Sequence, residues 1–222
     1  MNSQPATPMP WEGRPERADV IIMAGILGSA AYALVLLPLV PSMVGSHPAL
    51  LELLRGSMVA IVTMGALART GDASLFVALC AGIPALIAFD WAYWWAGRRW
   101  GEKGIHLMSG RSRRGAKHAA RARRMMERWG PAAVILAYIL PVPTALVDAA
   151  AGWAGMRFAV FVVCDIIGAL LWAGLLVALG YGLGQHAVDV VKQISHYSLY
   201  LTIAIVIAIV VQQGRANRRP AQ

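Results

Sequence analysis

Charged side chains are scarce in this chain. They make up 14% of its 222 residues, whereas a soluble globular domain carries about 25%. Apolar residues make up 58%. A water-soluble domain of this length cannot bury that much apolar surface, and a disordered chain would be far more polar. The composition therefore predicts a membrane protein.

Cysteine is nearly absent, which excludes a disulfide scaffold. Cys80 and Cys164 lie in apolar runs, so we interpret both as small core residues. Familiar catalytic motifs are missing too: the sequence has no His-Glu-x-x-His, no Gly-x-Ser-x-Gly and no P-loop lysine motif. The five histidines lie outside the segments predicted to span the membrane, which argues against a buried metal site. We therefore expect no enzyme activity, no metal and no cofactor.

Four apolar segments are predicted to cross the bilayer as helices. They are residues 20–37, 74–96, 158–183 and 198–211. The first is longer than the apolar core of a signal peptide, so we expect it to be retained. The sequence thus divides into a polar N-terminal tail (1–19), a membrane domain (20–213) and a basic C-terminal tail (214–222).

The positive charge is concentrated in one loop, residues 98–128. This loop holds eleven of the 20 Lys and Arg residues but only two acidic ones, and the rest of the chain is balanced. Such a block can bind nucleic acid, but long apolar segments flank it on both sides. That placement favours a cytoplasmic loop, and we expect no nucleic-acid partner. The location predicted is the bacterial inner membrane, with both termini and this loop cytoplasmic.

Within the basic loop, apolar residues recur at helical spacing at Ala119, Ala122, Met126 and Trp129. This pattern is typical of an amphipathic helix that lies on an anionic leaflet. A basic face that is merely solvated is an equal alternative.

Two further apolar segments are broken near their middle. Residues 49–68 are interrupted by Glu52, Arg55 and Gly56, and residues 131–153 by Pro141-Val142-Pro143. If the termini and the basic loop share one side, each segment has to enter and leave the membrane on the same side, the first from outside and the second from inside. Broken backbone survives at membrane depth where protein buries it or where it lines a wet cavity.

The fold class predicted is therefore an all-α polytopic membrane protein. It would have about four transmembrane helices and two opposed re-entrant helical hairpins, related as an inverted repeat. Six full spans are the alternative, since charge alone does not distinguish the two topologies.

Five ionisable residues fall inside these apolar segments, where a charge at the centre of a membrane helix costs about 2.5–3.5 kcal/mol. Arg55 can offset one carboxylate, and Glu52, three residues before it on the same helix face, is the nearest candidate. Asp90, Asp148 and Asp165 are left without an obvious partner. Carboxyl groups gathered in one low-dielectric site become plausible proton carriers. We therefore predict that these three aspartates and Glu52 form the proton-binding polar site. Capping of a half-helix is the alternative for each aspartate.

A lipid phosphate needs cationic donors, ideally arginine. Arg55 and Arg157 are the candidates in or beside the predicted segments. The tryptophans of residues 91–100 are interpreted first as an interfacial aromatic belt. They are Trp91, Trp94, Trp95 and Trp100.

Several short motifs resemble those of the DedA proteins, which carry the VTT (SNARE-associated) domain. One runs from Phe89-Asp90 through Trp94 to Gly97-Arg98-Arg99-Trp100-Gly101, and another from Phe161 and Asp165 through Gly168 to Trp172. Gly152 matches the glycine that ends the family's second hairpin. The resemblance covers roughly residues 35–185, and its order and spacing are more specific than any single motif. The matching positions are Gly97, Arg98, Gly101, Gly152, Gly168 and Trp172.

The chain departs from that family at its charged hairpin positions. The family's two arginines in the second hairpin are replaced by Tyr138 and Thr144. The acid of the first hairpin is missing near Arg55-Gly56-Ser57.

The resemblance implies flipping or scrambling of a lipid such as polyprenyl phosphate or a phospholipid, with proton coupling as one alternative. The expected partners are membrane lipids, and a homo-oligomer is left open. A membrane-bound enzyme that acts on lipid phosphates and a non-transporting scaffold are the competing hypotheses.

Overall fold

The computed structural model describes residues 10–11, 14–109, 113–184, 186 and 189. Within these residues the chain is helical and contains no strand, which confirms the all-α fold class. It divides into two compact units. Unit 1 contains the chain up to Ser29 together with Ile87–Trp172, and unit 2 contains Ala30–Leu86 and the chain from Ala173 onward.

Three segments of the described chain are long and apolar enough to cross a membrane: Arg17–Ser46, Leu75–Trp100 and Phe158–Leu183. They match the first three predicted spans, although the first one is longer than expected. The fourth predicted span (198–211) and the C-terminal tail (214–222) lie outside the described residues.

Unit 1 is built around the basic loop and the second broken segment. Its helices are the first part of α1 (Arg17–Leu36), α7 (Asp90–Trp100), α8 (Glu102–Ser109), α9 (Arg113–Trp129), α10 (Ala132–Ala137), α11 (Thr144–Trp153) and the first part of α12 (Phe158–Leu183). Its main core gathers small and aliphatic side chains of α9, α10 and α11 around Phe161 of α12.

Unit 2 contains the first broken segment. Its elements are the end of α1, η1 (Leu37–Leu39), α2 (Val40–Ser46), α3 (Pro48–Arg55), α4 (Met58–Thr70), α5 (Leu75–Cys80), α6 (Ile83–Ile87) and the end of α12. A small core joins Val44, Leu51 and Ala60 from α2, α3 and α4.

Both expected helix breaks are present. α3 ends at Arg55 because Gly56 takes a left-handed conformation (φ 58°), which glycine adopts without steric cost, and α4 begins at Met58. α10 ends at Ala137 and α11 begins at Thr144, with Pro141 and Pro143 between them. Re-entry of these two hairpins into the membrane stays a prediction.

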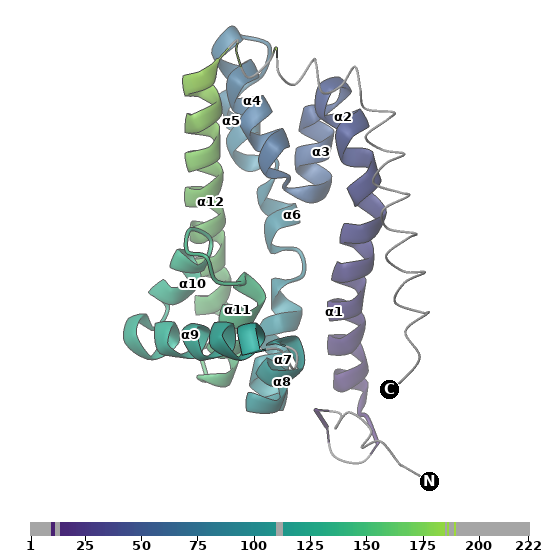
Figure 1. The fold of residues 1–222 in the computed structure, drawn as a ribbon, viewed down its shortest axis with the longest axis vertical. Coiled ribbons are helices and arrows are strands. Elements are labelled where there is room, and N and C mark those ends of the chain that lie inside the picture. Colours follow the sequence, from purple (N-terminus) through teal and green to yellow (C-terminus); the bar gives the residue numbers. More distant parts are fainter. Residues whose placement is uncertain (1–9, 12–13, 110–112, 185, 187–188, 190–222) are drawn as a thin grey trace. The chain divides into compact units, whose positions relative to one another are not determined.

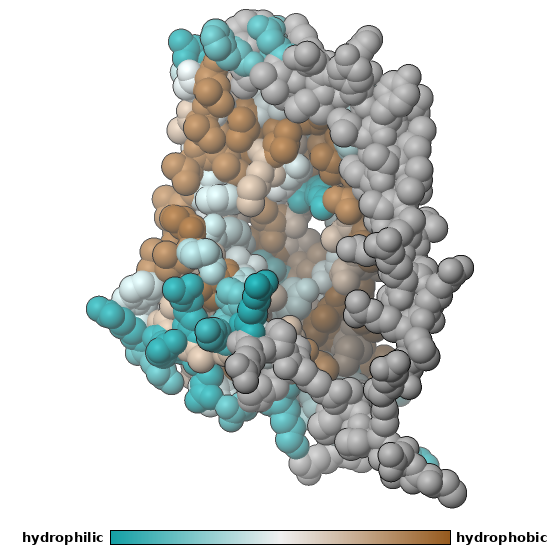
Figure 2. Space-filling view, in the orientation of Figure 1, coloured by the Kyte–Doolittle hydropathy of each residue, from teal (hydrophilic) through white to brown (hydrophobic). Residues whose placement is uncertain are grey.

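The amphipathic helix α9 lies crosswise to the first part of α12 (Figure 1). Its residues Ala119, Ala122 and Met126 are buried in the core of unit 1. Protein therefore covers most of the predicted apolar face, whereas Trp129 is 40% exposed, and contact of this helix with the anionic leaflet stays a prediction. The basic face stays exposed, and Figure 2 shows hydrophilic side chains gathered over α9.

The start of α1 is bound to the end of α7 by an ionic network within unit 1. Arg99 Nε donates to Asp19 Oδ1 at 2.6 Å, and Trp100 Nε1 donates to the same oxygen at 2.8 Å. Arg99 Nη2 also donates to Glu16 at 2.7 Å. Asp19 and Trp100 are both buried. Residues 16–19 thus pack against α7, and Trp100 belongs to this network rather than to an exposed aromatic belt.

Candidate functional site

Asp90 stands at the start of a helix because the segment before it is interrupted. α6 ends at Ile87 and α7 begins at Asp90, which is buried in the first turn of α7. The free N–H groups and the positive end of the helix dipole favour a carboxylate in that turn. The interruption therefore explains how an acid is tolerated within this segment.

Tyr138 and Asp148 lie on either side of the break in the second hairpin. Tyr138 directly follows α10, and the proline-containing stretch from Ile139 to Pro143 leads into α11. Asp148 sits inside α11 and is 2% exposed. It is not a cap residue, because it lies a full turn from the end of the helix.

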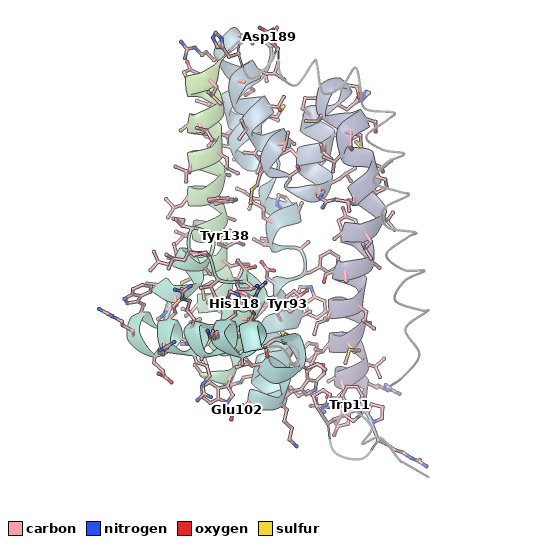
Figure 3. All side chains as sticks on the ribbon, in the orientation of Figure 1. Trp11, Tyr93, Glu102, His118, Tyr138 and Asp189 are labelled. Atoms are coloured by element: carbon pink, nitrogen blue, oxygen red, sulfur yellow. The ribbon has the colours of Figure 1, made fainter. Side chains whose placement is uncertain are left out.

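The Tyr138 hydroxyl links the hairpin to two carboxyl groups. It donates to Asp165 Oδ1 at 2.8 Å and lies 3.4 Å from Asp90 Oδ2. Asp148 lies within electrostatic range of both Asp90 and Asp165. Figure 3 shows Tyr138 beside α12. We call the three aspartates and the Tyr138 hydroxyl the carboxyl cluster.

No basic side chain neutralises this cluster in the part of the chain that the structure describes. The salt bridges found there join other residues. Among the described residues, Asp148 Oδ2 has no hydrogen-bond partner although it is buried. A buried carboxyl oxygen without a hydrogen-bond partner costs free energy. Binding of a proton, or of another hydrogen-bond donor, at Asp148 would reduce that cost.

Three of the family-motif glycines hold the cluster together. A Cβ atom on Gly97 would overlap the backbone of Ala149, and one on Gly152 would overlap the backbone of Trp94. These two contacts bring α7 and α11 together backbone to backbone. On α12, a Cβ on Gly168 would lie 2.7 Å from Cδ2 of the Tyr138 ring. The glycines thus set the positions of the helices that carry Asp90, Asp148 and Tyr138.

The remaining family-motif residues lie away from the hydroxyl. Gly101 ends α7 with a φ of 58°, and a Cβ there would lie 3.3 Å from the ring of Trp153. Arg98 is exposed, and Trp172 is half-buried on α12. Arg157, a predicted phosphate ligand, is exposed just before α12.

Glu52, the fourth acid in the predicted apolar segments, lies in unit 2, whereas the three aspartates lie in unit 1. Glu52 is fully buried, and neither carboxyl oxygen has a hydrogen-bond partner among the described residues. The backbone of Gly82 faces it, since a Cβ on Gly82 would lie 3.3 Å from Glu52 Oε1. The expected ion pair between Glu52 and Arg55 is wrong. Arg55 Nη1 instead donates to the carbonyl oxygen of Ala33 at 3.2 Å.

The sequence predicted that the aspartates share one site, but it did not predict Tyr138 as their hydrogen-bond partner. The available signal was its position, where the resembling family has an arginine. A neutral donor there can still satisfy a carboxylate, but it adds no charge. Within the described residues no group of three or more His, Cys, Asp or Glu side chains is arranged to hold a metal ion.

Comparison with known proteins agrees with the motifs. The VTT domain family matches residues 55–182, which is more than half of the chain. An uncharacterized membrane protein of Mycobacterium leprae is 30% identical over 105 residues, covering 47% of this chain and 49% of that protein. The chain therefore spans about half the length of this curated relative. No solved structure matches the chain. The chain is a membrane protein of the VTT domain family, the DedA proteins.

Proposed function

We propose that this protein moves a phosphate-bearing lipid, such as a polyprenyl phosphate or a phospholipid, between the leaflets of the bacterial inner membrane. The termini and the basic loop would face the cytoplasm. The observation that carries the proposal is the carboxyl cluster, in which Tyr138 links Asp165 and Asp90 beside the buried Asp148.

Proton coupling follows from the chemistry of the cluster. Burying several ionised carboxylates together, without a basic partner, costs far more free energy than burying protonated ones. Gain or loss of one proton would therefore change the charge of the cluster and its hydrogen bonds. Because Tyr138 donates to Asp165 and lies within reach of Asp90, it can follow such a change. A hairpin that shifts with protonation is a plain route to alternating access.

The break in the second hairpin would provide polar surroundings inside the membrane, which the headgroup of a moving lipid needs. Residues 138–143 leave backbone groups outside regular helix, between α10 and α11. Such backbone is tolerated at membrane depth where it lines a cavity or is buried in protein. Exposed arginines outside the cluster, among them Arg157, would attract the phosphate.

The test measures lipid movement in proteoliposomes. Purified protein is reconstituted with a fluorescent phospholipid or a labelled polyprenyl phosphate, and the loss of leaflet asymmetry is followed with and without a pH gradient. We expect movement that the gradient accelerates, and we expect Asp90→Asn to abolish the dependence on the gradient.

Asp72→Asn is the matched control, because Asp72 is an exposed aspartate after α4. It should behave like the unaltered protein. Absence of movement of either lipid, with or without a gradient, would contradict the proposal. An unchanged gradient response in Asp90→Asn would remove Asp90 from the mechanism.

A further inference from the structure

A row of positive charges runs along the exposed side of α9. Its members are spaced alternately by three and four residues, so they stay on one side of the helix. At about 1.5 Å per residue, the row is roughly 21 Å long. All of its members are exposed, and Figure 2 shows hydrophilic side chains gathered over this helix. We call these five residues the basic row: Arg114, Lys117, Arg121, Arg124 and Arg128.

Another side of α9 is held firmly by unit 1. Ala119 and Ala122 are buried in the core of the unit. Arg123, which does not belong to the basic row, pairs with Glu102 at 2.6 Å and lies 4.5 Å from the centre of the Trp153 ring. These contacts fix the helix, so the basic row is already in place before a partner binds. Preorganisation of this kind lowers the entropic cost of binding.

Within the described residues, the basic row has no acidic partner. The salt bridges found there use other arginines. Arg124 donates to the carbonyl oxygen of Ala120 in its own helix, and Arg128 lies over the ring of Trp129. The 11 acidic residues of the sequence never stand next to one another, and residues 214–222 are basic. A second copy would present the same basic helix, so the complementary charge has to come from another molecule.

The geometry of α9 argues against an anionic leaflet as that molecule. At about 3.6 residues per turn, the basic row lies roughly 130° around the helix axis from the buried apolar side chains. A helix that lies on a membrane inserts apolar side chains into the lipid beside its cations. The side of α9 that carries the basic row has no large apolar side chain, because Trp129 lies toward the buried side.

An acidic helix is complementary to the basic row. Carboxylates spaced by three and four residues fall on one side of a helix with the same period as the cations, so pairs can form along the whole row. The phosphates of a nucleic-acid duplex are also regularly spaced, but they wind around an axis, whereas the basic row is straight. The period of the row therefore favours a helical protein partner.

We propose that the basic row of α9 is a docking surface for an acidic helix of another protein, whose Glu or Asp residues alternate at spacings of three and four. The loop that contains α9 is predicted to be cytoplasmic, so the partner would approach from the cytoplasm. The proposal does not rest on lipid movement, because no member of the basic row belongs to the carboxyl cluster.

The test uses two synthetic helical peptides of identical composition and charge. The matched peptide has glutamates at alternating spacings of three and four, and the scrambled peptide has them spread around the helix. Binding of each labelled peptide to the full chain in phosphatidylcholine nanodiscs is followed by fluorescence anisotropy. We expect the matched peptide to bind about fivefold or more tightly than the scrambled one, and added salt to weaken its binding.

Charge changes on the row locate the binding surface. Replacing Arg114, Arg121 and Arg128 together by Gln should weaken binding of the matched peptide about tenfold or more, since each lost ion pair contributes a few-fold. Replacing the same three residues by Glu should reverse the preference, so that a peptide with a row of lysines binds instead. Binding of that peptide also shows that the altered protein is folded.

The matched control removes the same charge elsewhere on unit 1. Its substitutions are Arg14→Gln, Arg17→Gln and Arg98→Gln, all at exposed positions. The affinity for the matched peptide should change by less than about twofold, because salt screens exposed charges that lie outside the contact.

Three results would overturn the proposal. Equal affinity for the matched and scrambled peptides would mean that the row attracts negative charge without regard to its spacing. Displacement of the matched peptide by a lower concentration of DNA would assign the surface to nucleic acid. Quenching of a fluorophore on Arg121→Cys by spin-labelled phosphatidylglycerol, in a chain with Cys80→Ala and Cys164→Ala, would assign it to the leaflet.

Discussion

Unit 1 and unit 2 each contain a broken helical segment whose second arm packs closely against another helix. In unit 1, α11 contacts α7 through Gly97 and Gly152. In unit 2, α4 contacts α12 through Gly65 and Gly180, where a Cβ would overlap the backbone of Val177 and Val62. Small residues at helix crossings are the usual means of close packing in membranes. The two units therefore share a structural device.

Their buried acids differ. Unit 1 places Asp165 and Asp90 at the Tyr138 hydroxyl, with Asp148 within electrostatic range of both. Unit 2 buries Glu52 with no hydrogen-bond partner among the described residues. The proposed proton coupling therefore assigns the proton chemistry to unit 1, where three buried aspartates lie near one hydroxyl group. Glu52, by contrast, is expected to lower the stability of unit 2, because burying a carboxyl group without a hydrogen-bond partner costs free energy.

The largest effect on stability is expected at the glycines that allow close helix packing. Gly152→Ala would place a methyl group against the Trp94 carbonyl and force α11 away from α7, so the free energy of unfolding should fall by about 3 kcal/mol or more. Gly182→Ala is the control, since no neighbouring element of the described chain places an atom within 4 Å of its Cβ position. Thermal unfolding in detergent measures both. Equal stability of the two variants would show that the close crossing is not required.

A smaller effect of opposite sign is expected in unit 2. Replacing Glu52 by Met keeps the volume but removes an unpartnered buried carboxyl group, which should stabilise the protein by about 2 kcal/mol. Asp72→Leu, at an exposed site of the same unit, should change the midpoint of unfolding little. A less stable Glu52→Met variant would mean that Glu52 has a favourable partner.

In unit 1, removal of one hydroxyl group should have a moderate effect. Tyr138→Phe keeps the ring against Gly168 but loses the bond to Asp165, so the free energy of unfolding should fall by about 1–2 kcal/mol. Tyr181→Phe alters an exposed tyrosine of α12 and serves as control. Chemical unfolding curves of the two variants should separate. Superimposed curves would argue that the hydroxyl contributes no net stability.

The smallest effects on stability are expected from surface arginines. Replacing one should cost a similar free energy of unfolding in either unit. In unit 2, Arg69 donates to the carbonyl oxygens of Tyr181 and Gly182 at the end of α12. In unit 1, Arg123 pairs with Glu102 and lies 4.5 Å from the centre of the Trp153 ring. Replacing either arginine by Gln should cost about 1 kcal/mol or less. A loss several times larger at one site would place an additional contact in that unit.

Local sequence features were sufficient to predict the helix breaks. Gly56 and the prolines at 141 and 143 act on the backbone next to them, and the structure interrupts the helices at those positions. The gathering of Asp90, Asp148 and Asp165 was also predictable, because isolated acids in apolar segments need common polar surroundings.

Contacts that depend on a third element were not predictable. The spacing of Glu52 and Arg55 suggested an ion pair, but Arg55 is the last residue of α3 and reaches the end of α1 instead. Likewise, the periodicity of α9 showed which face is apolar but not that α11 would cover it. Tyr138 was missed as a site residue because its partners come from two other helices.

The most direct test of the account compares the two units in one transport measurement. The initial rate of movement of a labelled lipid phosphate is recorded as a function of the pH difference across the membrane, for Asp148→Asn and for Glu52→Gln. The account predicts that Asp148→Asn loses the dependence on the pH difference and that Glu52→Gln keeps it. Loss of that dependence in Glu52→Gln alone, or full retention in Asp148→Asn, would contradict the assignment of proton chemistry to unit 1.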